Sequence, residues 1–163
     1  MSDHVIGVDP GITGALALVG RDGDLIELAD MPTLRDGSAG RASVNAPLVA
    51  GILARWRARE VICEFVAARP GEGPTGAFSL GRSRGVIEGT CAALALPIRF
   101  VTPPSWKRTV GIPPGKEGAK DAARAAAIRR WPSHAAHFAR RKDDGRAEAA
   151  LIAVAGMKRE DRR

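Results

Sequence analysis

The chain has 163 residues, 45% of them hydrophobic, which suits one domain with a buried core and leaves no room for a second. Its 25 lysines and arginines exceed its 18 aspartates and glutamates, and the net charge of +7 favours nucleic acid or another acidic partner, unless solvent alone balances it. No apolar run approaches the roughly 20 residues of a membrane span, and the start, MSDH, lacks the order of a signal peptide, so we expect a cytoplasmic protein without a membrane segment.

We expect one domain over residues 1–158 and a charged tail over 159–163. The two cysteines, Cys63 and Cys91, lie in apolar stretches, and neither has a partner at metal-ligand spacing. Both are therefore predicted to be buried, reduced thiols.

Three short strands are predicted at the start of the domain. Apolar residues fill 5–8, 15–19 and 25–28, and the turn-forming segments DPGITG and RDGD separate them. Links this short favour an antiparallel meander. Residues 31–43 are rich in Gly, Ser, Pro and Arg, so we expect a loop there.

A helix followed by a fourth strand is predicted next. The helix covers residues 45–59, with Asn45 as its cap and Pro47 in its first turn. Its apolar side is expected to carry Leu48, Ile52, Leu53 and Trp56. Residues 60–64 then form the strand, and a surface loop over 67–77 follows beside Glu64.

A second helix is predicted over residues 77–94. Gly81, Gly85 and Gly89 recur every four residues and form one slim face, which lets another element approach closely. We favour packing within the molecule over a dimer contact for this face.

The second half of the chain continues with strand 96–102, a helical turn at 105–107 after two prolines, and a loop at 110–118. A helix over 120–131 follows, and its basic residues either track phosphates or form a solvated face. The basic residues of this loop and helix are Lys116, Lys120, Arg124, Arg129 and Arg130.

The segment 132–142 is polar, and the last helix covers 144–157. His134 and His137 are three residues apart, a spacing that binds metal on some helices, but no third ligand is near and we interpret them as surface residues.

Four acidic residues stand out in this α/β order, which suits a mixed central sheet. Asp9 ends the first strand and Glu64 ends the fourth, so both carboxylates meet at one sheet edge if those strands are neighbours. Asp144 and Glu148 are four residues apart and share one face of the last helix.

Oxygen ligands of this kind suit Mg²⁺ or Mn²⁺, and two such ions about 3.5–4 Å apart can cleave a phosphodiester with water. Taken singly, three of these acids have ordinary explanations: Asp9 as a turn former, Glu64 as an exposed strand end and Asp144 as a helix cap. Glu148 is different, because an apolar helix follows it and an acid there needs a partner or an ion.

Five motifs in a fixed order connect these acids. They are IGVDPG at 6–11 with TG at 13–14, VICE at 61–64, LGRSRGV at 80–86, PPSWKRTVG at 103–111 and GRAEAALIA at 145–153. With them the chain resembles the RuvC family of Holliday-junction resolvases, in a phage-type variant. The resemblance covers nearly the whole chain and implies an RNase H-like fold with a mixed five-stranded sheet flanked by helices.

The resemblance also implies an activity. The family members are homodimeric crossover-junction endodeoxyribonucleases, which nick opposed strands of a four-way DNA junction symmetrically. The resemblance therefore implies Mg²⁺ or Mn²⁺ as cofactor, with two ions per site, and water as the nucleophile. Asp9, Glu64 and Glu148 occupy ligand positions of the family. The chain departs from the family on the last helix, where members often carry two acids, or a His and an acid, three residues apart, because the residue three before Glu148 is Gly145. Helical geometry favours Asp144 as the fourth ligand, with Asp143 as the alternative.

Basic and aromatic residues of the matched motifs are expected to contact DNA. Lys107 takes a position beside the scissile phosphate, and the loop residue Lys116 another. Further expected contacts are Arg82, Arg84, Arg108 and Lys120, and either Phe65 or Phe78 contacts the junction centre. A branch-migration helicase is a conceivable partner that the sequence does not identify.

Two other functions compete with the resolvase. The segment VDPGITG is similar to the phosphate loop of actin-like ATPases and sugar kinases, but 163 residues cannot hold the two domains that those proteins need. A protein of the same fold that binds junctions without cutting them, or cuts other branched nucleic acids, remains the alternative.

Overall fold

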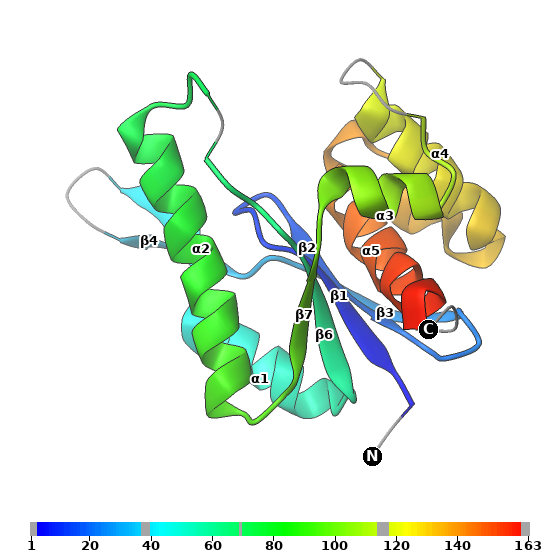
Figure 1. Cartoon of the computed structure of the whole chain (residues 1–163), viewed down its shortest axis with the longest axis horizontal. Helices are drawn as coiled ribbons and strands as arrows, with labels where there is room; N and C mark the ends of the chain where they lie inside the picture. Colours follow the sequence, from blue (N-terminus) through cyan, green and yellow to red (C-terminus); the bar gives the residue numbers. More distant parts are fainter. Residues whose placement is uncertain (1–2, 37–39, 69, 114–117, 161–163) are drawn as a thin grey trace.

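A mixed five-stranded sheet forms the centre of the computed structural model, which describes residues 3–36, 40–68, 70–113 and 118–160 (Figure 1). The strand order is β3-β2-β1-β6-β7. The bounds are β1 Val5–Asp9, β2 Ala15–Val19, β3 Leu25–Asp30, β6 Glu60–Glu64 and β7 Ile98–Val101. The predicted meander and the predicted mixed five-stranded sheet are both confirmed.

The sheet pairing brings the ends of β1 and β6 together. β1 is antiparallel to β2 but parallel to β6, with Val8 opposite Cys63, and β6 is parallel to β7. The first four residues of β1 and of β6 are buried, as expected for central parallel strands covered on both faces. Asp9 and Glu64 therefore end neighbouring strands at one edge of the sheet.

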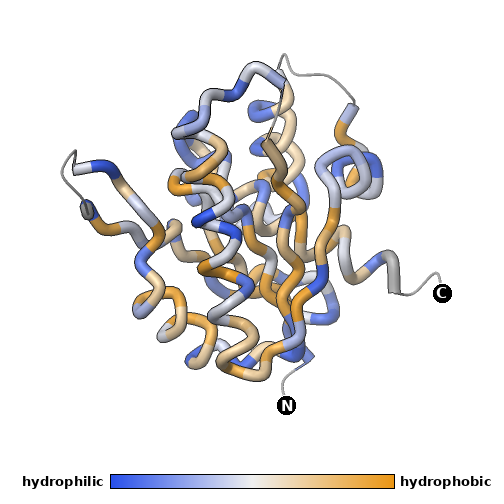
Figure 2. Tube along the Cα trace, turned by 60° about the vertical axis from the view of Figure 1, so that its left-hand side comes forward, coloured by the Kyte–Doolittle hydropathy of each residue, from blue (hydrophilic) through white to orange (hydrophobic). Residues whose placement is uncertain are grey.

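Helices cover both faces of this sheet, and each face has its own core (Figures 1 and 2). Helices α1, Ala46–Trp56, and α2, Pro74–Ala93, pack with Ile6 of β1 on one face. Helices α3, Pro103–Thr109, α4, Ala119–Arg130, and α5, Asp144–Glu160, pack with Val5 on the other. Two short 3₁₀ segments, Pro132–Phe138 and Arg141–Asp143, join α4 to α5.

The predicted loop at 31–43 is wrong, because this part of the chain contains a second, two-stranded sheet. Strands β4, Thr33–Asp36, and β5, Arg41–Val44, pair antiparallel. The hairpin buries few side chains, so its short strands lack the apolar alternation by which a strand is recognised.

Helix α1 confirms the predicted cap but corrects the predicted face. The Asn45 side chain accepts a hydrogen bond from the Leu48 amide at 3.3 Å. Leu48 itself is 56% exposed, whereas Val49 is fully buried in its place beside Leu53 and Trp56. Leu53 and Trp56 are thus confirmed on the buried side and Ile52 packs against it, whereas Val49 takes the place predicted for Leu48.

Helix α2 begins at Pro74, three residues before the predicted start, and its glycine face is open. A methyl group at Gly81, Gly85 or Gly89 would meet no described atom within 4 Å. The favoured packing of this face within the molecule is thus wrong. Cys91 of the same helix is a buried free thiol, as is Cys63, and both predictions are confirmed.

Helix α5 lies unusually close to β1. A methyl group at Gly7 would overlap the carbonyl oxygen of Ala149, and one at Gly145 would lie 2.6 Å from the carbonyl oxygen of Thr13. These two glycines therefore allow the first turns of α5 to approach the end of β1. Within the described ranges, no helix is both long and apolar enough to cross a membrane.

Candidate active site

Four carboxylates influence one another at the edge where β1 and β6 end. Asp9 and Glu64 come from these strands, and Asp144 and Glu148 come from the first turns of α5. Negative charge on Glu64 and Asp144 raises the pKa of both Asp9 and Glu148. The structure thus brings together the four acids that the sequence singled out.

Burial is the main cause of the two altered pKa values, and repulsion within the cluster adds to it. The pKa of Asp9 is raised to about 6, against a smaller lowering by the Gly11 amide, which donates to Asp9 Oδ1 at 3.3 Å. The pKa of Glu148 is raised to about 7 by burial and then by Asp9 and Glu64. Paired acids whose protonation is pushed toward neutral pH are typical of functional sites.

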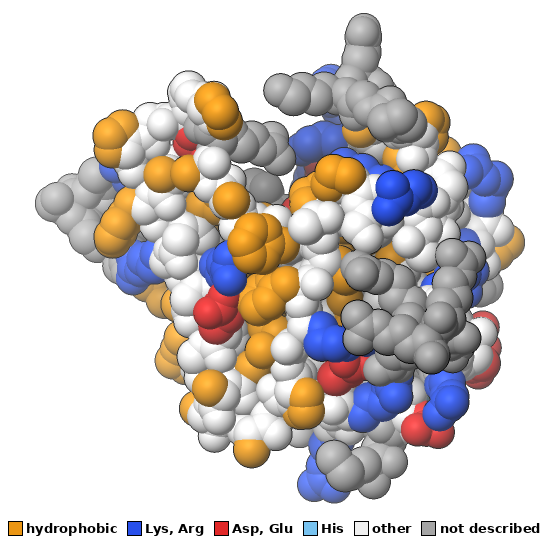
Figure 3. Space-filling view, viewed as in Figure 1, with side chains coloured by type: hydrophobic (Ala, Val, Ile, Leu, Met, Phe, Trp, Pro, Cys, Tyr) orange, Lys and Arg blue, Asp and Glu red, His pale blue; other side chains and the backbone are white. Residues whose placement is uncertain are grey.

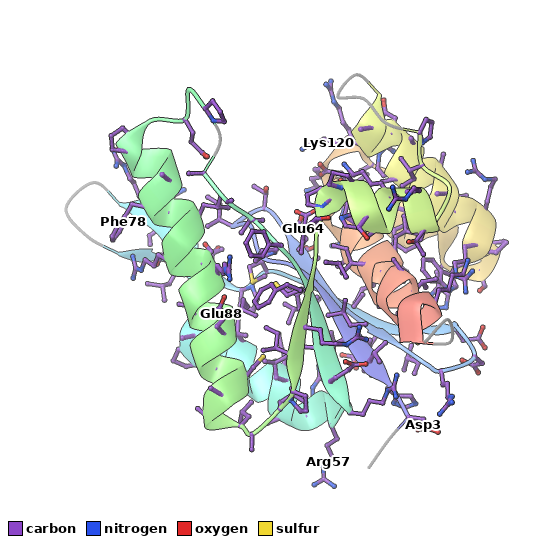
Figure 4. The ribbon with its side chains drawn as sticks, in the orientation of Figure 1. Asp3, Arg57, Glu64, Phe78, Glu88 and Lys120 are labelled. Carbon is purple, nitrogen blue, oxygen red and sulfur yellow. The ribbon has the colours of Figure 1, made fainter. Side chains whose placement is uncertain are left out.

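The other contacts of the cluster come from α3 and α4. The Trp106 indole nitrogen donates to Glu64 Oε1 at 2.8 Å, and Lys107 Nζ lies 3.9 Å from Glu148 Oε1. Lys120 Nζ lies 2.5 Å from Asp144 Oδ2, and Figure 4 shows Lys120 reaching in from α4 above Glu64. Lys107 and Lys120 thus place positive charge directly against the acids of α5.

Asp143, the alternative fourth acid, has different surroundings. Its side chain is 2% exposed, and the Arg140 guanidinium binds both carboxylate oxygens at 3.0–3.2 Å. Arg146 lies 3.7 Å away, and hydrogen bonding to Arg140 holds the pKa of Asp143 below its usual range. Asp143 therefore belongs to an arginine pair that ties the start of α5 to the preceding turn, and Asp144 faces the cluster.

The donor set fits a hard divalent cation in its chemistry. Carboxylate oxygens are the ligands that Mg²⁺ and Mn²⁺ prefer, and a cation would offset the repulsion that raises the pKa of Asp9 and of Glu148. No three His, Cys, Asp or Glu side chains among the described residues lie close enough to hold an ion in this conformation. Ion binding therefore requires the carboxylates to close in while Lys107 and Lys120 withdraw.

A hollow in the surface leads to this cluster. Figure 3 shows it between α2 and α3, with acidic atoms visible inside and basic side chains beside it. Next to Glu64, a shallow pocket of about 290 Å³ lies between α2 and the segment after β6, with Val66, Ala67, Leu80 and Arg84 in its lining. The site is thus open to a large substrate.

The remaining predicted DNA contacts are spread over the molecule. Arg108 and Arg82 are exposed on α3 and α2, and Lys116 lies outside the described residues. Arg84 pairs with Glu88 and stacks over Phe65, with its guanidinium carbon 4.4 Å from the ring centroid. Phe78 is 73% exposed, and Figure 4 shows it on the side of α2 turned away from Glu64.

Sequence reasoning missed the contact between Trp106 and Glu64. Trp106 lies in the motif PPSWKRTVG, where the sequence predicts a role only for the basic residues Lys107 and Arg108. The two residues are 42 positions apart, and no local pattern connects an indole with a carboxylate at that distance.

Comparison with known proteins agrees with the architecture. No protein-family model and no curated protein matches the sequence. A solved structure of T. thermophilus RuvC in complex with a Holliday junction substrate is similar to this chain, with a TM-score of 0.63 and 17% sequence identity. The match covers 97% of this chain and 95% of the RuvC chain. The chain has a RuvC-like fold. A second structure of Thermus thermophilus RuvC covers 97% of the chain and 96% of its own at a TM-score of 0.58 and the same 17% identity.

Proposed function

We propose that this RuvC-like chain is a divalent-metal-dependent endonuclease that resolves four-way DNA junctions by paired, symmetric nicks. The observation that carries the proposal is the coupled cluster of Asp9, Glu64, Asp144 and Glu148 at the end of β1 and β6. The RuvC-like fold supports it, and so does the net charge of +7, which favours a polyanionic substrate.

In this proposal the four acids are the metal ligands. Bound there, Mg²⁺ or Mn²⁺ would activate a water and offset the charge of the leaving oxygen. Asp9 lies at a strand end and Glu148 on a largely buried helix turn, so only small shifts of their side chains would be needed to bring the carboxylates around an ion. Both must be ionised to bind a cation, which the raised pKa values oppose until the cation arrives.

Basic side chains next to the acids would hold the DNA backbone. Lys107 and Lys120 contact acids in the metal-free conformation, and they become available to phosphate oxygens once a cation replaces them. Arg108 follows Lys107 on α3 and is exposed. These contacts would position the junction without reading its sequence.

We also propose that the active form is a homodimer, because two symmetric nicks require two sites. The open glycine face of α2 supports this helix as the contact, since Gly81, Gly85 and Gly89 leave room for a second backbone. The exposed Phe78 lies on the same helix.

The test is cleavage of labelled four-way junctions, flaps and linear duplex with Mg²⁺, Mn²⁺ or EDTA. We expect paired nicks on the junction alone and only with metal. Asp9→Asn should lose at least about 100-fold in cleavage rate yet retain junction binding, which rests mainly on phosphate contacts. Binding without nicks in either metal would support the alternative, a junction-binding protein that does not cut.

Variants of Asp143 and Asp144 distinguish a structural acid from a catalytic one in the same assay. Asp144→Asn should be folded and inactive. Asp143→Asn removes a buried charge that binds Arg140, whose own side chain is 57% exposed, and should lose about 1–3 kcal/mol of stability, while its nicking rate at low temperature stays near wild type. A dead Asp143→Asn beside an active Asp144→Asn would reverse the assignment.

A further inference from the structure

We propose that Trp106 is a positioning residue for Glu64, and that its indole N–H holds this carboxylate in the orientation that binds a cation. The inference rests on the proposed metal-dependent function. It starts from one contact, the 2.8 Å hydrogen bond from the Trp106 indole nitrogen to Glu64 Oε1.

The sheet explains how the indole reaches Glu64. β7 is the parallel neighbour of β6, with Val101 opposite Glu64, and the Phe65 amide donates to the Val101 carbonyl at 2.7 Å. Helix α3 begins two residues later, so the chain turns back over the end of β6. Trp106 therefore faces the last residue of the neighbouring strand.

Packing fixes the indole in this place. Trp106 is 0% exposed and belongs to the core that β1, α4 and α5 share. The surrounding core restrains a ring enclosed in this way, and a buried indole N–H needs an acceptor. Glu64 supplies it, and its own side chain is thereby held in one orientation.

The chemistry of the donor suits a metal ligand. An indole N–H donates one hydrogen bond, accepts none and carries no charge. Lys107 and Lys120 meet Glu148 and Asp144 as cations, and a divalent ion competes with both. The Trp106 N–H donates to one carboxylate oxygen of Glu64, so the other oxygen stays available to an ion. The neutral indole does not repel that ion. Partners of this kind orient metal ligands in many sites, and their loss typically weakens metal binding 10–100-fold.

Trp131 offers a matched control in the same core. It is 4% exposed, and its indole nitrogen donates to the Gly23 carbonyl at 2.9 Å instead of to a carboxylate. Trp106→Phe and Trp131→Phe each remove one indole and one buried hydrogen bond. They differ in whether Glu64 loses its donor.

The first measurement follows the indole N–H signals of the wild-type protein by NMR during titration with Mg²⁺. The chain has three tryptophans, so three signals are expected, which the Trp→Phe variants assign. The Trp106 signal should shift as the ion binds, while that of Trp131 stays in place. An unmoved Trp106 signal in a protein that binds Mg²⁺, or a wild type that binds no ion, would overturn the proposal.

The second measurement compares Mn²⁺ affinity by calorimetry and the kinetics of junction cleavage. Trp106→Phe should bind Mn²⁺ about 10-fold more weakly and lose kcat with an unchanged KM for the junction, and Trp131→Phe should match wild type in both. Equal Mn²⁺ affinity in the two variants would overturn the positioning role. A wild type that binds Mn²⁺ but nicks nothing would overturn the proposed function alone, and if Trp106→Phe does not fold, the NMR titration still decides.

Discussion

At the scale of single residues, ionisation of Glu148 is unfavourable in the folded protein. Its side chain is 15% exposed on the second turn of α5, and burial together with Asp9 and Glu64 raises its pKa to about 7. A folded-state pKa above the ordinary value means that the folded protein prefers the protonated acid. Its stabilising contribution is complete below about pH 4.5 and is lost as pH rises through about 7.

Glu148→Gln should therefore stabilise the metal-free protein at pH 8 by about 2 kcal/mol and change little at pH 4.5. The amide keeps the shape of the acid but cannot ionise. Urea unfolding in EDTA at the two pH values measures the difference. Glu27→Gln, which alters an acid paired with Arg55 far from the cluster, is the control and should show no such pH-dependent gain. A Glu148→Gln protein less stable than wild type at pH 8 would contradict the assigned cause.

At the scale of elements, the contact between β1 and α5 sets the geometry of the site. Gly7 lies beneath Ala149 and Ala153, and the absence of a side chain there lets the helix backbone approach the strand. Because Asp9 follows two residues after Gly7 and Glu148 directly precedes Ala149, the same close approach determines how far apart the two acids lie. The packing of α5 on β1 therefore also determines where Asp9 and Glu148 lie relative to each other.

Gly7→Ala should cost more than about 3 kcal/mol, because its methyl group overlaps a helix carbonyl that cannot move without shifting α5. Gly51→Ala is the matched control: Gly51 lies inside α1, a methyl group there would meet no described atom within 4 Å, and alanine should be neutral or stabilise by up to about 1 kcal/mol. Thermal unfolding of both variants makes the comparison. Similar melting temperatures would show that α5 can retreat from β1 at little cost.

At the scale of the whole molecule, helix α2 borders the site and also carries an open row of glycines. Gly81 and Gly85 line the pocket next to Glu64, and a methyl group at either position would meet no described atom within 4 Å. The exposed glycine face is the surface that we propose for the homodimer, and a second copy there would repeat the site by a two-fold axis.

Gly85→Glu should prevent this association without unfolding the monomer, because the position is open and the substitution adds negative charge to a close contact. Sedimentation should show a dimer for wild type and a monomer for the variant. Paired nicking of junctions should fall with it. Gly51→Glu adds the same charge to an open position on α1 and should remain dimeric. A dimeric Gly85→Glu would place the contact elsewhere.

The parts that sequence predicted are those with a local signal. The apolar runs before Asp9 and Glu64 predicted both strands and the shared edge, and helical spacing predicted that Asp144 accompanies Glu148. The β4–β5 hairpin was missed because exposed strands carry no alternation, and on α1 Val49 was missed in favour of the exposed Leu48. The link from Trp106 to Glu64 and the separate partners of Asp143 and Asp144 depend on tertiary contacts, which periodicity does not encode.

The order of the four acids along the chain has a consequence for synthesis. Asp9 and Glu64 emerge from the ribosome early, but α5 carries the other two and is made about 80 residues later, or several seconds at ordinary rates of translation. Until α5 packs on β1, the face of the strand around Gly7 is exposed, and two of the four carboxylates of the cluster are absent. If the chain is the proposed nuclease, its site is therefore incomplete until α5 has been made.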